Sequence, residues 1–142
     1  MDRDDVAAAI DLLRGGSFMP EFEDGTRVGD YWSAVEETRR QRGDVLVAEV
    51  DGEVVGVVQV IIFPHFQHAG GWCCEIESVH VRSDRRSRGI GAQLLLAAEE
   101  LARERGCYRI QLTSRNERAD AHRFYLANGY GQTSRGFKKF FD

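Results

Sequence analysis

A strand-like segment, a turn rich in arginine and glycine, and a long amphipathic segment follow one another in the middle of this 142-residue chain. Ile76–Val81 has the composition of a strand, and in Ile90–Arg105 apolar residues recur every three or four positions, which predicts a helix. Tyr108–Thr113 then reads as a second strand. A strand, a helix and a strand in this order predict a parallel crossover, so the chain must fold as an α/β protein.

The remaining pattern adds helices before this unit, a hairpin, and further elements after it. Asp51-Gly52 separates two apolar runs and is a strong hairpin turn signal. We expect residues 1–142 to form one α/β (α+β) domain, with a mixed, mostly antiparallel central sheet flanked by about four helices. The other expected helices are Asp4–Leu13, Asp30–Arg42 and Ala119–Ala127; the other expected strands are Val45–Val50, Val54–Phe63, Cys73–Val81 and a terminal hairpin of Tyr130–Thr133 with Phe137–Phe141.

Composition excludes several classes of protein. The formal net charge of −4 argues against a nucleic-acid-binding domain, and no apolar run approaches the length of a membrane span. The acidic N-terminus lacks an apolar signal core, so we expect a cytoplasmic protein. Three cysteines without a Cys-x-x-Cys pair predict neither a disulfide framework nor a zinc site.

The turn itself has the features of a phosphate-binding cradle. Gly89 and Gly91 lack a Cβ, so a ligand can approach the backbone closely. The following helix offers free N–H groups and the positive end of its dipole. The turn is not a Walker loop, and it lacks the third glycine of a dinucleotide fold. A glycine-rich helix entry that binds no ligand has the same spacing.

Two flanking segments give the turn a more specific meaning. Glu75–Val81 precedes Arg86-x-x-Gly89-x-Gly91, and Ala121–Tyr130, containing His-Arg-Phe-Tyr, follows about 30 residues later. Together they resemble the GNAT superfamily of acetyl-CoA-dependent N-acetyltransferases, from about Val45 to Phe141. Members of this family usually begin with a strand that precedes the first helix, whereas this sequence starts almost directly in that helix. Either the strand is absent, or the start of the sequence is short.

The resemblance implies a site for acetyl-CoA as acetyl donor. The pyrophosphate loop and helix start of the family match Arg86, Ser87, Arg88, Gly89, Ile90, Gly91 and Ala92; its pantetheine-pairing strand matches Val79, His80 and Val81; and Asn116 is the candidate for a further cofactor contact. The tyrosine that lies near the thioester sulfur in the family matches Tyr125. No metal ligand is implied.

The expected reaction is direct attack of an amine on the acetyl thioester in a ternary complex. Glu77 is the preferred base, acting through water, and Glu75 is the second candidate. Strand alternation puts Glu75, Glu77 and Val79 on one face. The Val79 N–H is the expected oxyanion donor, and Tyr125 the acid that protonates the departing thiolate. His80 points away from Val79 and is expected to be structural.

Several features concern the acceptor, which we expect to be a small-molecule amine. The His65–His68 loop and Trp72 give modest similarity to aminoalkylphosphonate N-acetyltransferases, although a polar surface loop has the same composition. Aromatic side chains between the first two helices are candidates for a substrate wall or for ordinary packing: Phe18, Met19, Phe22, Tyr31 and Trp32. Arg115, Arg118 and Arg123 are candidates for contacts with an acidic substrate or with cofactor phosphates.

Two other functions fit the same motifs. One is acetylation of a protein N-terminus or lysine, and the other is non-catalytic binding of an acyl-CoA, which would not need Tyr125 or Glu77. A homodimer is possible because dimers are common in the family. Sequence does not identify the acceptor amine.

Overall fold

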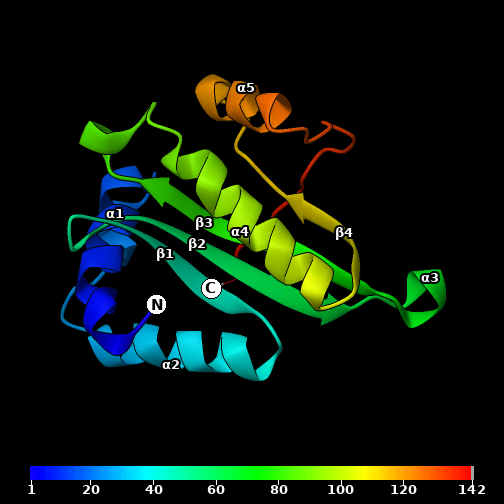
Figure 1. The fold of residues 1–142 in the computed structure, drawn as a ribbon, viewed down its shortest axis with the longest axis horizontal. Coiled ribbons are helices and arrows are strands. Elements are labelled where there is room, and N and C mark those ends of the chain that lie inside the picture. Colours follow the sequence, from blue (N-terminus) through cyan, green and yellow to red (C-terminus); the bar gives the residue numbers. More distant parts are fainter. Residues whose placement is uncertain (142) are drawn as a thin grey trace.

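A four-stranded sheet lies between two groups of helices in the computed structural model, which describes residues 1–141 (Figure 1). The strand order is β1-β2-β3-β4; the β1–β2 and β2–β3 pairs are antiparallel and the β3–β4 pair is parallel. In chain order the elements are η1 (Arg3–Asp5), α1 (Val6–Gly16), η2 (Pro20–Phe22), α2 (Val28–Arg40), β1 (Asp44–Val50), β2 (Glu53–Pro64), α3 (Gln67–Gly70), β3 (Trp72–Val81), η3 (Ser83–Arg85), α4 (Ile90–Glu104), β4 (Cys107–Leu112) and α5 (Ala119–Ala127). The predicted fold class is confirmed.

Two hydrophobic clusters hold the helices on opposite faces of the sheet. The larger one joins α4 to β2 and β3, with Val58, Ile76, Leu94 and Leu95 among its buried members. The smaller one joins α1 and α2 to β1 and β2. Val55–Val58 is buried without interruption, as expected for a central strand that is covered on both faces.

Most predicted elements are present, with shifted ends. Asp30 lies inside α2 rather than at its cap, and its carboxylate pairs with Arg27. Gly15 and Gly16 end α1 from within the helix. Asp51 and Gly52 both have positive φ, as a tight hairpin turn requires.

The expected terminal hairpin is wrong. No strand forms among residues 130–141, and all residues after Tyr130 in this range are exposed. Gly131 and Gly136 flank a polar run (132–135), so this segment has no alternating apolar face that could be buried on the sheet. Tyr130 alone is packed on the larger cluster.

A β-bulge in β3 overturns the expected alternation of its side chains. Gln59 pairs with Glu77 and Val57 pairs with His80, so Val58 alone faces both Ser78 and Val79. Ser78 adopts φ +55°, in the left-handed region. The extra residue reverses the alternation, and both Ile76 and Val79 contact the α4-side cluster. Val79 therefore does not share a face with Glu75 and Glu77.

No helix among residues 1–141 combines the length and the apolar character needed to cross a membrane.

The core accounts for a testable contrast within α4. Leu95 is 1% exposed, whereas its neighbour Leu96 is 56% exposed. Leu95→Ala leaves a cavity between α4 and the sheet and is expected to lower the free energy of unfolding by about 2–5 kcal/mol. Leu96→Ala is the matched control and is expected to change it by less than about 0.5 kcal/mol. Urea unfolding measures both; equal losses would contradict this packing.

Candidate active site

A wedge opens between β3 and β4 because their parallel pairing stops partway along β3. The last registered pair is Ile76 with Leu112, where β4 ends. β3 continues to Val81 and has no strand partner on this side among residues 1–141. Figure 1 shows the chain turning away after β4 towards α5. Glu77–Val81 thus presents an unpaired strand edge, the kind of surface that can pair with an extended ligand.

The Arg86–Gly91 turn lies where this edge ends and α4 begins. Ser87 and Gly89 have φ of +60° and +80°, and no side chain caps α4 at Gly89. Among residues 1–141, nothing lies within 4 Å of the Cβ position at Gly89, so the space beside this residue is open. A left-handed turn that leads into an uncapped helix start is a good binding site for an anion.

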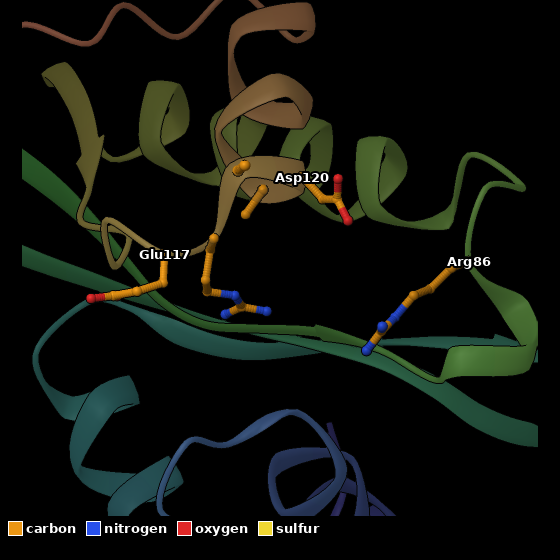
Figure 2. A pocket seen from close by; sticks show the side chains of 6 residues that line it. Arg86, Glu117 and Asp120 are labelled. Atoms are coloured by element: carbon orange, nitrogen blue, oxygen red, sulfur yellow. The ribbon is translucent and has the colours of Figure 1, made fainter.

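Arg86 folds back onto the strand instead of reaching outward. Its Nε donates to the Val81 carbonyl oxygen at 3.1 Å. Arg86 lines one side of a hollow of about 320 Å³, and residues 117–121 at the start of α5 line the other. Figure 2 shows Arg86 facing Asp120 across this hollow, while Glu117 points away from it. The hollow therefore connects the turn with the opening of the wedge.

Close packing at Gly91 positions α5 on α4. A Cβ on Gly91 would approach the Phe124 ring to 3.0 Å, so only glycine lets the ring lie this close. Tyr125 follows, its ring centroid 5.3 Å from that of Phe124 and 6.0 Å from that of Tyr130. Burial raises the pKa of Tyr125, against the opposing charge of Arg118. The phenol is therefore protonated at neutral pH.

Glu77 lies on the other side of the sheet from α4. It pairs across the strands with Gln59, whose amide donates to the Thr38 hydroxyl of α2. Burial raises the pKa of Glu77, and Lys138 from the C-terminal segment opposes this shift. The Glu75 carboxylate instead accepts a hydrogen bond from Gln111 at 2.6 Å. Of the two candidate bases, Glu77 is the one whose carboxylate has no side-chain hydrogen bond within residues 1–141.

His80 is packed against the end of α1. A Cβ on Gly16 would overlap its Nδ1, so the helix can dock here only with glycine. Burial lowers the pKa of His80, and Arg118 and Arg86 lower it further, so the ring is neutral near pH 7. This agrees with the structural role predicted for its side chain.

The loop after α1 reaches the segment that joins β4 to α5. The Cζ atoms of Arg115 and Arg118 lie 4.7 Å and 5.9 Å from the centroid of the Phe18 ring. Of the other proposed wall residues, Phe22 is exposed, Trp32 packs on the smaller cluster and Tyr31 donates to Glu23. Only Phe18 is thus shown to contact the β4–α5 segment, which also contains the exposed Asn116.

The histidine loop lies at the other end of the sheet. His65 and His68 follow β2, where β3 starts, while the wedge begins at Glu77, roughly 16 Å further along β3 at the usual rise per strand residue. Figure 1 shows α3 at this far end. His65 Nδ1 lies 2.5 Å from the Tyr108 hydroxyl, and the His68 ring lies against the Tyr108 ring. The loop is therefore a polar surface feature and not part of the wedge.

Metal-ligand clusters of three or more His, Cys, Asp or Glu side chains do not occur within residues 1–141.

Sequence patterns missed the contributions of Gly16, Ser78 and Lys138. Gly16 stands where a glycine usually ends a helix, so the sequence does not indicate its contact with His80. Ser78 is an ordinary strand residue, so the sequence does not indicate a bulge there. Lys138 lies far along the chain from Glu77, and no local periodicity connects the two.

Comparison with known proteins agrees with this geometry. The model of the acetyltransferase (GNAT) family matches residues 9–130. An aminoalkylphosphonate N-acetyltransferase of Salmonella typhimurium is 43% identical over 63% of this chain, and the aligned part spans only 57% of that protein. A glucosamine 6-phosphate N-acetyltransferase of Trypanosoma brucei brucei is 31% identical over 80% of this chain and 76% of its own length.

A solved structure resembles the whole fold. The crystal structure of a transcriptional regulator from Bacillus halodurans has 32% sequence identity and a TM-score of 0.88, covering 99% of this chain and 96% of its own. The family model and the two N-acetyltransferases indicate the same family. The chain therefore belongs to the acetyltransferase (GNAT) family.

Proposed function

We propose that this protein transfers an acetyl group from acetyl-CoA to the primary amine of a small molecule, by direct attack within a ternary complex. The observation that carries the proposal is the continuity between the unpaired edge of β3 and the uncapped start of α4. An extended chain ending in a pyrophosphate needs both surfaces, one for its amide groups and one for its phosphates.

The donor fits the residues that line this path. Arg86–Gly91 and Ala92 would hold the pyrophosphate through backbone N–H groups and the helix dipole. The backbone of Val79–Val81 would pair with the pantetheine amides, and Asn116 is the candidate for a further contact. When bound, acetyl-CoA would supply the acetyl group as a reactive thioester.

The cysteines favour direct attack over an acetylated-enzyme intermediate. Cys73 and Cys74 are buried, and burial raises the pKa of Cys74 to about 12. Cys107 starts β4, at the end remote from the wedge, and burial raises the pKa of its thiol as well. A nucleophilic cysteine needs a thiolate at the reacting carbon, and none of these three meets that requirement.

Glu77 is the proposed base. An alkylammonium has to lose a proton before its nitrogen can attack the carbonyl carbon. A carboxylate whose pKa is raised by burial accepts that proton more readily than an ordinary one, here through a water molecule. The Val79 N–H is the proposed donor to the carbonyl oxygen.

Tyr125 is the proposed acid. As the carbon–nitrogen bond forms and the carbon–sulfur bond breaks, the phenol gives its proton to the departing sulfur. A tyrosine kept protonated by burial is suited to this step. Glu77 then releases to solvent the proton that it accepted from the amine, and Tyr125 takes up a proton from solvent.

A small acceptor is favoured over a protein. The two curated relatives are named for amines that carry a phosphonate or a phosphate group. Phe18 and the two arginines beside it would contact a small acceptor, whereas a peptide would need an open groove. A purely acyl-CoA-binding module remains the alternative of another class, and turnover distinguishes it.

Binding of acetyl-CoA is the first expected outcome. Isothermal titration calorimetry should give one site per chain, and Gly89→Ala should weaken binding roughly tenfold because a left-handed residue at the helix start becomes strained. Gly52→Ala, at φ +78° in the β1–β2 turn, is the matched control for strain and should leave the affinity unchanged. Absence of binding at millimolar acetyl-CoA would refute the proposal.

Replacement of Tyr125 tests the acid. Tyr125→Phe is expected to lower kcat by about 10²-fold or more, measured as thiol release, with little change in the affinity for CoA. Tyr130→Phe is the matched control, because this ring packs on Tyr125 but donates to Glu99. Unchanged turnover in Tyr125→Phe would remove the residue from the mechanism.

The raised pKa of Glu77 has a consequence for stability. Below the ordinary value of 4.5 the carboxyl is protonated in both folded and unfolded chains. As pH rises from there through the raised folded pKa, only the folded state resists ionisation, so wild-type stability should fall relative to Glu77→Gln. Urea unfolding of both proteins between pH 4 and 8 measures the difference, with exposed Glu36→Gln as a control for the substitution. An opposite slope would show that the carboxylate is stabilised in the fold.

A further inference from the structure

The guanidinium groups of Arg115 and Arg118 converge on the same ring. Their Cζ atoms lie 4.7 Å and 5.9 Å from the centroid of Phe18, which is 53% exposed. A cation above an aromatic face is attracted by the ring quadrupole, so Phe18 holds both side chains in place. Phe18 is itself brought here by the docking of Gly16 on His80.

The backbone that carries the two arginines is also fixed. The N–H of Arg118 donates to the Arg115 carbonyl oxygen at 3.1 Å, and this oxygen lies 2.8 Å from His122 Nε2. The N–H of His122 donates to the Arg118 carbonyl oxygen at 3.0 Å. The pair is therefore presented by a tight turn and not by a loose loop.

Neither guanidinium has an acidic partner in the part of the chain that the structure describes. Within residues 1–141, no carboxylate lies within 4.0 Å of Arg115 or Arg118, whereas nearby Arg123 pairs with Asp120 and Arg82 pairs with both Glu53 and Asp84. Two adjacent cations without a counter-ion repel each other, and an anion bound between them would relieve that repulsion.

The position of the pair relates it to the acceptor. Phe18 follows α1, which packs on the sheet face opposite α4. Glu77 lies on this same face, across from Gln59. Arg118 is close enough to Tyr125 and to His80 for its charge to affect both groups. Arg118 also lines the hollow opposite Arg86. The arginine pair therefore reaches from the hollow beside the Arg86–Gly91 turn to the loop after α1.

We propose that Arg115 and Arg118, held on Phe18, bind a doubly charged phosphorus oxyanion, a phosphonate or phosphate monoester, on the acceptor amine. This inference rests on the proposed function. The N–H donors of a guanidinium match the spacing of the oxygens in such groups. Two guanidinium groups carry two positive charges, so they match the charge of a dianion better than that of a ligand with a single carboxylate. The protein is thus selective for amines that carry such a group.

The decisive measurement is the ratio of kcat/KM for two acceptors of equal length, 2-aminoethylphosphonate and ethanolamine. The wild-type protein should have a higher kcat/KM for the phosphonate than for ethanolamine, and phosphoethanolamine should likewise be preferred to ethanolamine. Arg115→Gln and Arg118→Gln should each reduce the ratio about 10- to 100-fold, the loss of a charge-assisted contact. Phe18→Leu should reduce it about 2- to 5-fold. Arg40→Gln, exposed on α2 and paired with Glu37, should leave it unchanged.

A second readout is independent of turnover. Binding of 2-aminoethylphosphonate, followed by ³¹P NMR in the presence of CoA, should be lost in Arg115→Gln together with Arg118→Gln, while circular dichroism stays as in wild type. Inorganic phosphate should compete with the phosphonate acceptor and not with acetyl-CoA.

Three outcomes overturn the inference and leave the proposed function intact. They are an unchanged ratio in both arginine variants, weaker affinity for CoA with an unchanged ratio, and a wild type that acetylates only amines without a phosphorus oxyanion. The second outcome would assign the pair to the phosphates of the donor. Failure of wild type to bind acetyl-CoA would refute both proposals together.

Discussion

The parallel pairing of β3 with β4 and its early end determine the arrangement of everything else. As far as Ile76 and Leu112 the two strands are bonded, and α4 packs across them. Beyond that pair the sheet lacks a strand, and the bulge at Ser78 turns Val79 and Val81 towards α4. A sheet normally avoids an unpaired inner edge, because its N–H and C=O groups lose their partners. Here the missing partners define the place where a ligand can be held.

Three glycines allow the parts around the wedge to come together. Gly89 takes a left-handed conformation at the start of α4, Gly91 admits the Phe124 ring, and Gly16 admits His80. Under the proposed function, the first contributes an anion site. The second lets α5, which carries Tyr125, pack on α4, and the third lets the end of α1, just before Phe18, pack on His80. A side chain at any of the three positions would act on the site through the backbone or through a neighbour, without contacting a ligand itself.

The order of elements could be predicted from the sequence, because each depends on a local signal. The apolar run of β2, the Asp51-Gly52 turn and the amphipathic stripe of α4 are all visible within a few residues. The prediction of a terminal hairpin is wrong because short runs with aromatic residues have the composition of strands even where no partner strand is available. The prediction of the sheet face on which Val79 lies is wrong because side chains alternate only in a regular strand, and the bulge at Ser78 interrupts β3.

Long-range juxtapositions were beyond the reach of such patterns. Phe18 and Arg115 are almost a hundred positions apart, and only the folded sheet brings them together. The strand position of Glu77 predicts it as the base, but what distinguishes it from Glu75 is the hydrogen bond that Glu75 accepts from Gln111 on the neighbouring strand β4. The composition of the His65–His68 loop predicts a role at the site, yet the loop lies before the start of β3, whereas the wedge begins at Glu77.

The wedge lies at the edge of the sheet, whose two faces are covered by α4 and by α1. A ternary complex formed there would let the donor and the acceptor approach from different faces of the sheet. Under the proposed reaction, an acetylated product can leave on the Phe18 side while the spent thiol is still seated along β3. Release of the acetylated product and release of CoA would then not compete for the same exit.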